Sequence, residues 1–255
     1  MKKLQKPLLF ILLIIFLYTS SSYSMERKED ICVNKLFVVE SKIENKENEF
    51  FKYNIKYPFM NFKEEYAKKN KKNVKIIDEI NKDIYEYIMS FKENISKQSE
   101  KYKEDYTNIY AKEKEKYVKY QYEADSDYQV TYNKNNIISI PITTYEFTGG
   151  AHGMTYLKSF NYNLNNGSKL MLKDLFKEDI DYEKIINNFI KSEISKNKLL
   201  YFTGKDGFKG IKRDQDFYLE DDGIVVYFQL YDIAPYYVGI PKFKLTYNQF
   251  GDYLK

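Results

Sequence analysis

The 255-residue chain has no tryptophan, one cysteine and one histidine. A disulfide needs two cysteines, so a chain whose single cysteine is Cys32 cannot form an intrachain disulfide. The stability of the fold therefore has to come from a hydrophobic core. Zinc sites usually take several histidine or cysteine ligands, so this composition argues against a zinc centre. We therefore expect neither a metal nor a cofactor. Cys32 is expected to be a small apolar residue that begins the first strand, with a reactive thiol or an intermolecular bridge as the alternatives.

The hydrophobic run near the N-terminus, Leu8–Leu17, is also short. A membrane-spanning helix needs roughly 20 apolar residues, which this run does not reach. Lysines precede it, and small or polar residues follow at positions 20–24. This layout predicts a secretory signal peptide over residues 1–24, cleaved after Ser24, with an uncleaved N-terminal anchor as the alternative. We expect an extracytoplasmic protein that is either secreted or anchored to the outer face of the cytoplasmic membrane through this segment alone.

The chain has no large excess of positive or negative charge. It carries 41 basic and 37 acidic residues, and without Lys2, Lys3 and Lys6 of the predicted signal peptide the net charge is +1. Nucleic-acid-binding domains show a basic stripe. Here lysines alternate with glutamates, as in Lys112–Lys116, which is typical of a solvated helix face. We therefore expect no nucleic-acid partner.

Apolar residues that recur every three or four positions predict two helices. The longer helix has Asn73 as its N-cap and extends to about Lys116, and a break at Gln98-Ser99 is compatible with its weaker second half. The shorter helix covers Tyr182–Asn197. The apolar stripe of the longer helix consists of Val74, Ile77, Ile80 or Asn81, Ile84, Ile88, Phe91 and Ile95.

Alternating apolar and polar residues predict strands, and together with the helices they indicate an α+β fold of antiparallel sheets. Pro58 is expected to end the second strand. Asp125-Ser126-Asp127 is expected to form a turn rather than a calcium site. Asn165-Asn166-Gly167 predicts a hairpin. The expected strands are Val33–Glu40, Phe50–Phe59, Tyr117–Glu123, Tyr128–Tyr132, a central Ile137–Phe147, Thr155–Leu164, Phe217–Leu219, Ile224–Leu230 and a last strand with Phe243, Leu245 and Tyr247.

The most distinctive stretch is Tyr145–Met154, in which the only histidine, His152, lies among Gly149, Gly150 and Gly153. Glycines this close together let the backbone adopt dihedral angles that other residues avoid, so an extended segment ends here, turns sharply and restarts. The stretch is not a phosphate loop, because no Lys-Ser/Thr pair and helix follow it. His152 as a general base is one alternative. Because no nucleophile-elbow sequence accompanies it, we predict a structural or partner-contact role and no catalytic residue.

This stretch and several C-terminal segments together resemble a pair of adjoining bacterial domains of unknown function. The matching segments are Tyr145–Gly153, Ser159–Leu164, Gly167, Leu170–Phe176, 217–224, 227–229, 233–236 and 239–243. Such pairs occur in the outer part of a lysozyme-sensing anti-sigma factor and beside peptidoglycan or polysaccharide deacetylases. We expect two α+β domains of similar size, 32–155 and 156–254, in one compact unit. Only Met1–Lys6 precede the apolar segment, too few residues for a sigma-binding domain, and no deacetylase domain follows the pair.

Surface loops on this scaffold are the remaining candidates for function. We select the loops 148–153, 201–216 and 231–239. The residues proposed to bind a partner are Thr148, Gly149, Gly150, His152, Gly153, Tyr231, Tyr236 and Tyr237. The hypothesis is a non-catalytic binding module of the bacterial envelope, with a lysozyme-like protein or a cell-wall glycan as its partner. The alternatives are a cell-wall-modifying hydrolase that uses His152 and a purely structural envelope protein.

Overall fold

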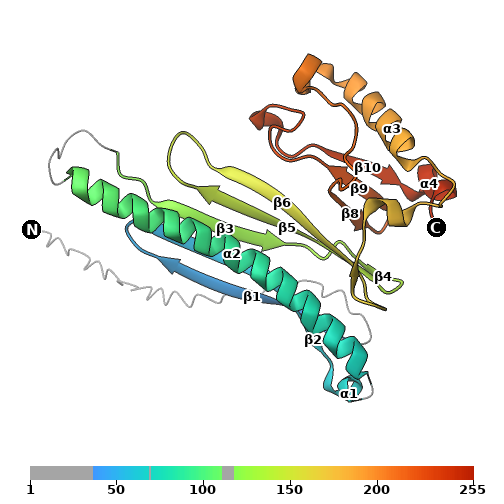
Figure 1. The fold of residues 1–255 in the computed structure, drawn as a ribbon, viewed down its shortest axis with the longest axis horizontal. Helices are drawn as coiled ribbons and strands as arrows, with labels where there is room; N and C mark the ends of the chain where they lie inside the picture. Colours follow the sequence, from blue (N-terminus) through green and yellow to red (C-terminus); the bar gives the residue numbers. More distant parts are fainter. Residues whose placement is uncertain (1–36, 69, 111–117) are drawn as a thin grey trace, which may run out of the picture. The chain divides into compact units, whose positions relative to one another are not determined.

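The computed structural model describes residues 37–68, 70–110 and 118–255, and residues 31–255 form one compact unit (Figure 1). The predicted signal peptide, Cys32 and the beginning of the first predicted strand lie outside the described residues. No described helix is long and apolar enough to cross a membrane. The fold is α+β, as predicted, with a seven-stranded and a three-stranded sheet.

The larger sheet has the strand order β1-β2-β3-β5-β6-β7, and β4 pairs with β5. Its pairs are antiparallel, as expected, with one exception: β2 and β3 are parallel. Parallel neighbours need a crossover connection, and the long helix α2 supplies it between these two strands. The strands are β1 (Phe37–Glu47), β2 (Phe51–Phe62), β3 (Tyr122–Tyr128), β4 (Tyr132–Lys134), β5 (Ile137–Phe147), β6 (Met154–Asn163) and β7 (Ser168–Lys169).

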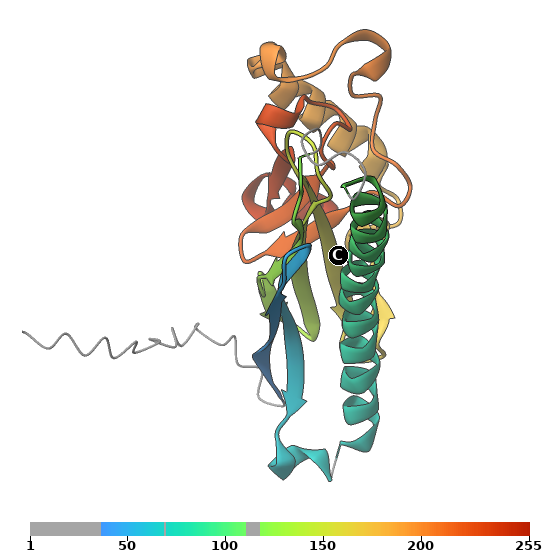
Figure 2. The ribbon, with the colours of Figure 1, turned by 90° about the vertical axis from the view of Figure 1, so that its left-hand side faces the viewer.

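Helix α2 (Lys71–Tyr110) follows the short α1 (Glu64–Ala67) and lies along one face of this sheet (Figures 1 and 2). The predicted apolar stripe points into the core, where the isoleucines of α2 pack against those of β2 and β5. Asn81 is the polar member of the stripe, and its side-chain amide bonds both the N–H and the carbonyl of Met60 at 2.8 Å. The buried Asn81 amide therefore has a hydrogen-bond partner for both its oxygen and its nitrogen.

The predicted N-cap of the long helix was wrong, and the break that its weaker second half allowed is absent. The helix begins at Lys71, so Asn73 lies in its first turn and is not the N-cap. The helix also continues through Gln98-Ser99 without a break. Ser99 is buried there, and its hydroxyl donates to the Phe50 carbonyl at 2.8 Å, so the helix gains a contact with the sheet at this point.

Two predicted strand ends were also wrong. Strand β2 continues past Pro58 to Phe62. Because β3 pairs with β2 only over residues 51–55, Pro58 has a strand on one side only, where a missing N–H is tolerated. Asp125-Ser126-Asp127 lies inside β3 and is not a turn. The buried Ser126 hydroxyl accepts from the Lys56 N–H and donates to the Lys56 carbonyl, which satisfies a polar residue within the sheet.

The smaller sheet has the antiparallel order β10-β9-β8, and α3 supplies two fully buried side chains, Ile186 and Ile190, to its core. The Asp181 side chain caps α3 by accepting from the Lys184 N–H. The predicted shorter helix is confirmed, and β8 and β9 form a hairpin with its turn at Asp221-Asp222. Tyr247 begins α4 instead of ending the last strand. The elements are α3 (Tyr182–Lys196), β8 (Phe217–Glu220), β9 (Gly223–Tyr227), β10 (Lys242–Thr246) and α4 (Tyr247–Phe250).

Strand β6 contacts both cores, because successive side chains of a strand point to opposite faces. Phe160 packs on Tyr87 of α2, with ring centroids 5.5 Å apart. On the other face, Asn161 accepts from the Ser139 hydroxyl and donates to the Phe217 carbonyl of β8. The Leu219 N–H in turn donates to the Ser139 hydroxyl. This buried network connects the two sheets across the predicted domain boundary.

Candidate functional site

The loop 148–153 joins β5 to β6, and its backbone requires glycine. Gly149 and Gly150 have φ angles of +96° and +90°, which side-chain-bearing residues rarely adopt. Gly153 has an ordinary φ but no room, because an added Cβ would lie 2.4 Å from the Glu146 carbonyl oxygen and 2.5 Å from the Tyr145 ring. The sharp turn between two extended segments is present as the sequence predicts.

His152 brings this loop to the segment 231–239. Its ring stacks on that of Tyr236, with the centroids 4.0 Å apart and the planes at 24°. The Tyr236 hydroxyl donates to the Gly153 carbonyl at 3.0 Å, and His152 Nδ1 lies 3.1 Å from the same oxygen. Tyr231 completes the group, with a ring centroid 5.8 Å from that of Tyr236 and a backbone φ of +67°. Two of the three loops selected from the sequence therefore meet here.

The outer side of this contact is exposed and apolar. Tyr237 is 72% exposed, Tyr231 is 47% exposed and Leu199 is 94% exposed. The Tyr237 hydroxyl lies within hydrogen-bonding distance, 3.4 Å, of the Leu199 carbonyl, so Leu199 belongs to the same surface. We call the set His152, Leu199, Tyr231, Tyr236 and Tyr237 the aromatic patch. Leu199 was not among the predicted residues, and its only signal was a Leu-Leu pair just after a predicted helix.

The other end of the loop also contacts an aromatic ring. Gly149 lies on Tyr120, whose ring carbons would be 3.1 Å from an added Cβ, and Tyr120 meets Phe147 edge to face at 6.0 Å. Thr148 is half-buried beside it, whereas Gly150 is exposed with open space around it. The loop is thus held between Tyr120 and Tyr236, and its tip faces solvent.

The third selected loop, 201–216, supports the segment 231–239 without joining the aromatic patch. The Phe202 N–H donates to the Ile233 carbonyl at 2.9 Å. Phe208 packs edge to face on Phe228, with ring centroids 5.6 Å apart. We interpret this loop as part of the hydrophobic core beneath the smaller sheet.

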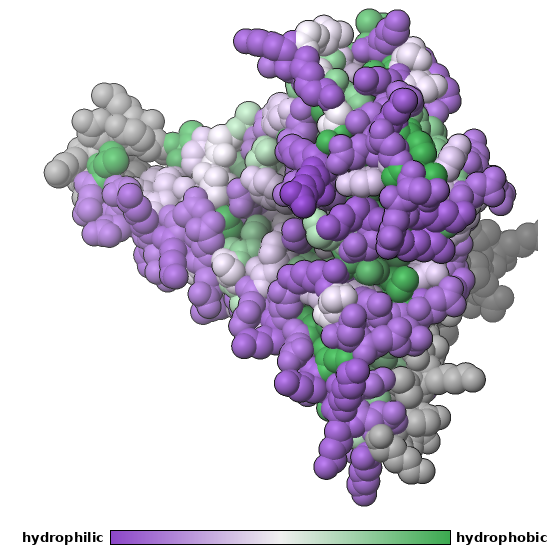
Figure 3. Space-filling view, turned by 45° about the vertical axis from the view of Figure 1, so that its right-hand side comes forward, coloured by the Kyte–Doolittle hydropathy of each residue, from purple (hydrophilic) through white to green (hydrophobic). Residues whose placement is uncertain are grey.

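The face drawn in Figure 3 is largely hydrophilic, with hydrophobic side chains in small areas between the charged ones.

Burial raises the pKa values of two residues beneath the loop. Burial raises the pKa of Glu146, and a hydrogen bond from the Tyr156 hydroxyl opposes this rise. Burial also raises the pKa of Tyr145, and the nearby carboxylate of Glu123 adds to the effect. Within the part of the chain that the structure describes, no group of three or more His, Cys, Asp or Glu side chains is placed to hold a metal ion.

Two known families match this chain. Residues 44–155 match the family described as Deacetylase PdaC, and residues 173–248 match the protein family of unknown function DUF3298. The two matched regions follow one another along the chain. The resemblance to paired envelope domains is confirmed. His152 lies in the region that matches PdaC and Tyr236 in the region that matches DUF3298, so the ring stack joins the two matched regions.

Two curated proteins of Bacillus subtilis (strain 168) are distant homologues. The peptidoglycan-N-acetylmuramic acid deacetylase PdaC is 31% identical over 137 residues, which cover 52% of this chain and 29% of that protein. The anti-sigma-V factor RsiV is 32% identical over 129 residues, which cover 47% of this chain and 44% of that protein. The chain thus spans less than half the length of either relative.

Solved structures show the same fold. A DUF3298 family member from Bacteroides fragilis superposes with a TM-score of 0.62 at 23% identity and covers 86% of this chain and 94% of that one. A DUF3298 family protein from Pseudomonas aeruginosa PAO1 gives a TM-score of 0.50 at 16% identity and covers 87% and 95% of the two chains. At these identities the likeness concerns the fold alone.

Proposed function

We propose that this chain is a non-catalytic, extracytoplasmic binding module of the bacterial envelope, and that the aromatic patch binds a lysozyme-like protein. The class of partner comes from the resemblance to the lysozyme-sensing anti-sigma factor. The compartment comes from the predicted signal peptide. The single observation that carries the proposal is the meeting of the loops 148–153 and 231–239 at the stack of His152 on Tyr236.

The composition of the aromatic patch fits a protein interface. Tyrosine is enriched among the residues that contribute most to binding, because its ring buries a large apolar area and its hydroxyl keeps a polar contact. Tyr231 and Tyr237 are exposed, and Leu199 extends the apolar area beside them. A partner would cover side chains that are now in contact with water.

Two residues of the patch, His152 and Tyr236, are already held in place by contacts within the chain. Tyr236 is fixed by its ring contact with His152 and by its hydrogen bond to the Gly153 carbonyl. Loss of side-chain freedom on binding costs roughly 0.5–1.5 kcal/mol for each mobile side chain. A residue that is already fixed avoids most of this cost, so the stacked pair favours binding without a rearrangement of the loop.

Long-range electrostatics contribute little to this proposal. Without the predicted signal peptide the chain has a net charge of +1, which gives no net attraction to a basic partner. Affinity would then rest on the buried aromatic area, and the association rate would respond weakly to salt. We expect the dissociation constant to change less than threefold between about 0.05 and 0.3 M salt, where the Debye length falls from roughly 14 to 6 Å.

The test is interferometry with the purified chain and an immobilised lysozyme at about 0.15 M salt. We expect saturable binding at micromolar or tighter, and at least tenfold weaker binding for Tyr237→Ala. Tyr85→Ala is the matched control, because Tyr85 is a 47% exposed tyrosine on α2, outside the aromatic patch. Absence of binding, or equal losses for the two variants, would contradict the proposal.

The alternative is a cell-wall-modifying hydrolase that uses His152. The observation in its favour is the match of residues 44–155, which include His152, to a family described as a deacetylase. The two functions separate in the variant His152→Ala, assayed for release of acetate or sugar fragments from purified peptidoglycan. Turnover by the natural chain that is lost in a folded His152→Ala variant would favour the hydrolase.

A further inference from the structure

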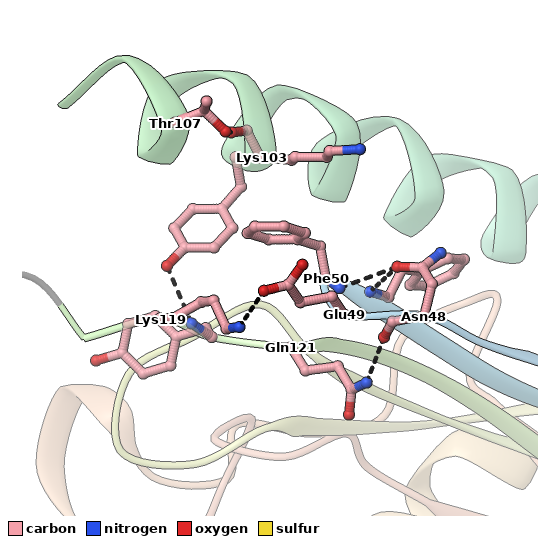
Figure 4. A network of polar contacts seen from close by, with 10 residues as sticks. Asn48, Glu49, Phe50, Lys103, Thr107, Lys119 and Gln121 are labelled. Atoms are coloured by element: carbon pink, nitrogen blue, oxygen red, sulfur yellow. Dashed lines mark hydrogen bonds and ion pairs between the residues drawn. The ribbon is translucent and has the colours of Figure 1, made fainter. Parts of the chain in front are cut away.

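A groove of about 630 Å³ lies between α2 and the turn that joins β1 to β2. This volume falls within the roughly 300–1,000 Å³ that small-molecule sites occupy. Its lining comes from the second half of α2 and from the adjoining ends of β1 and β2, and it includes no residue of the aromatic patch. Figure 4 shows the polar contacts that join this turn to Lys119 and Gln121.

Several main-chain groups of this turn already have partners. The N–H groups of Phe50 and Phe51 both donate to Asn48 Oδ1 at 2.9 Å. The Phe50 carbonyl accepts from the Ser99 hydroxyl and from the Tyr122 N–H, each at 2.8 Å. An extended peptide binds mainly through free main-chain groups of this kind. At Phe50 and Phe51 the turn therefore offers a ligand side chains and not free main-chain N–H groups.

The charges that line the groove are balanced. Lys46, Lys92 and Lys103 face Glu49, Glu93 and Glu100. Lys92 pairs with Glu44 at 2.6 Å, and Glu49 pairs with Lys119. Balanced charge gives neither a cation nor an anion a net attraction, which argues against a phosphate, a polyanion or a metal ion as the ligand.

Four charged groups remain available to a ligand. Among the described residues no carboxylate lies within ion-pair distance of Lys46 or Lys103, and no amine lies within that distance of Glu93 or Glu100. Two ammonium groups supply hydrogen-bond donors and two carboxylates supply acceptors. A hydroxyl group both donates and accepts, so a molecule that carries many hydroxyls matches this set.

We propose that this groove is a second binding site and that it takes an uncharged saccharide. The hydroxyls of the sugar would bond Lys46, Lys103, Glu93 and Glu100, and its apolar face would lie against the rings in the groove wall. The half-buried Tyr53 is such a ring, and the Lys92 ammonium lies 5.2 Å from its centroid, so the sugar would use the part of the ring that Lys92 leaves open. The site is separate from the aromatic patch, so the chain would hold a protein partner and a glycan at different places.

The test is a calorimetric titration of the purified chain with two neutral probes, tri-N-acetylchitotriose and maltotriose. We expect saturable binding of at least one probe at millimolar concentration or tighter. Lys103→Gln and Glu100→Gln should each weaken it at least fivefold. Both side chains are exposed, so these variants should fold normally by circular dichroism. Lys101→Gln is the matched control, because Lys101 is exposed on the same helix and is not part of the groove lining.

The two probes distinguish two kinds of saccharide site. Binding of the N-acetylated probe alone identifies a cell-wall type of glycan, and binding of both probes identifies a more general saccharide site. Absence of saturable binding with both probes, or an equal loss of affinity in Lys101→Gln and Lys103→Gln, overturns the proposal. Lysozyme binding should be unchanged in Lys103→Gln, so failure here is distinguishable from failure of the proposed function.

Discussion

The imidazole ring of His152 lies on the phenol ring of Tyr236, with the ring centroids 4.0 Å apart and the planes at 24°. The first residue belongs to the region that matches the PdaC family and the second to the region that matches DUF3298. The Tyr236 hydroxyl also bonds the Gly153 carbonyl, so ring and hydroxyl hold the same loop. The glycine loop is therefore held against the second matched region through His152 and Gly153.

The Tyr236 hydroxyl is expected to stabilise the fold as well as the loop. Tyr236→Phe keeps the ring stack and removes the hydrogen bond to Gly153, so the free energy of unfolding should fall by about 0.5–1.5 kcal/mol. Tyr237→Phe is the control, because its hydroxyl makes an exposed contact at 3.4 Å and should change the value by less than about 0.5 kcal/mol. Urea unfolding followed by circular dichroism measures both. Indistinguishable variants would show that the hydrogen bond contributes nothing.

Gly153 should tolerate no side chain. An added Cβ would lie 2.4 Å from the Glu146 carbonyl oxygen and 2.5 Å from the Tyr145 ring, so β5 and β6 would have to separate locally. We expect Gly153→Ala to lower the free energy of unfolding by about 1–3 kcal/mol or more. Gly251→Ala is the control, because Gly251 has helical dihedral angles and open space around it. A Gly153→Ala variant as stable as Gly251→Ala would contradict the geometry.

The sequence alone predicts the elements whose signals are local. Strand β5 was predicted with its observed ends because it is a long apolar run with turns on both sides. Helix α3 was predicted to within one residue because its periodicity is strong. In contrast, the sequence around Asp125 and Asp127 predicts a turn when it is considered alone, because aspartate is common in turns. They lie in β3 because the intervening Ser126 is satisfied by Lys56, which comes from a distant part of the chain.

The candidate site was only partly predictable for the same reason. The glycine loop has a local signature, and it was identified with its histidine. That His152 meets Tyr236 depends on how the two sheets pack, which no local pattern encodes. Leu199 is in the aromatic patch because α3 ends beside the segment 231–239, and its exposure is visible only in the fold. The groove beside α2 is likewise formed by residues from separate segments.

The network around Asn161 should make the two sheets unfold together. Asn161→Ala removes one bond from Ser139 and one to the Phe217 carbonyl, and it leaves these buried groups without their partner. We expect a loss of about 2–4 kcal/mol, since each unsatisfied buried group costs roughly 1–3 kcal/mol. Lys158→Ala on the exposed part of the same strand is the control. Urea unfolding should show one transition in the natural chain, and equal stability of the two variants would contradict the role of the network.

The pH dependence of stability offers a test of the environment of Glu146. Burial holds the pKa of this carboxyl above its ordinary value of 4.5, against the opposing hydrogen bond from Tyr156. A group whose pKa is raised on folding stabilises the fold fully below its unfolded pKa, and the contribution is lost as the pH rises through the folded pKa. Glutamine does not titrate. The free energy of unfolding of Glu146→Gln should therefore rise relative to that of the natural chain as the pH increases from 4 to 7.

Asp222 provides a control of the opposite sign. A hydrogen bond from Lys244 lowers the pKa of its carboxyl, so its contribution to stability is present above the ordinary pKa of 3.8 and is lost as the pH falls. Asp222→Asn should lose stability relative to the natural chain as the pH rises from 3 to 5, whereas Glu146→Gln gains. Urea unfolding at unit pH intervals from 3 to 7 measures both differences. If the two differences have the same sign, the Glu146 carboxyl is not buried as the structure shows.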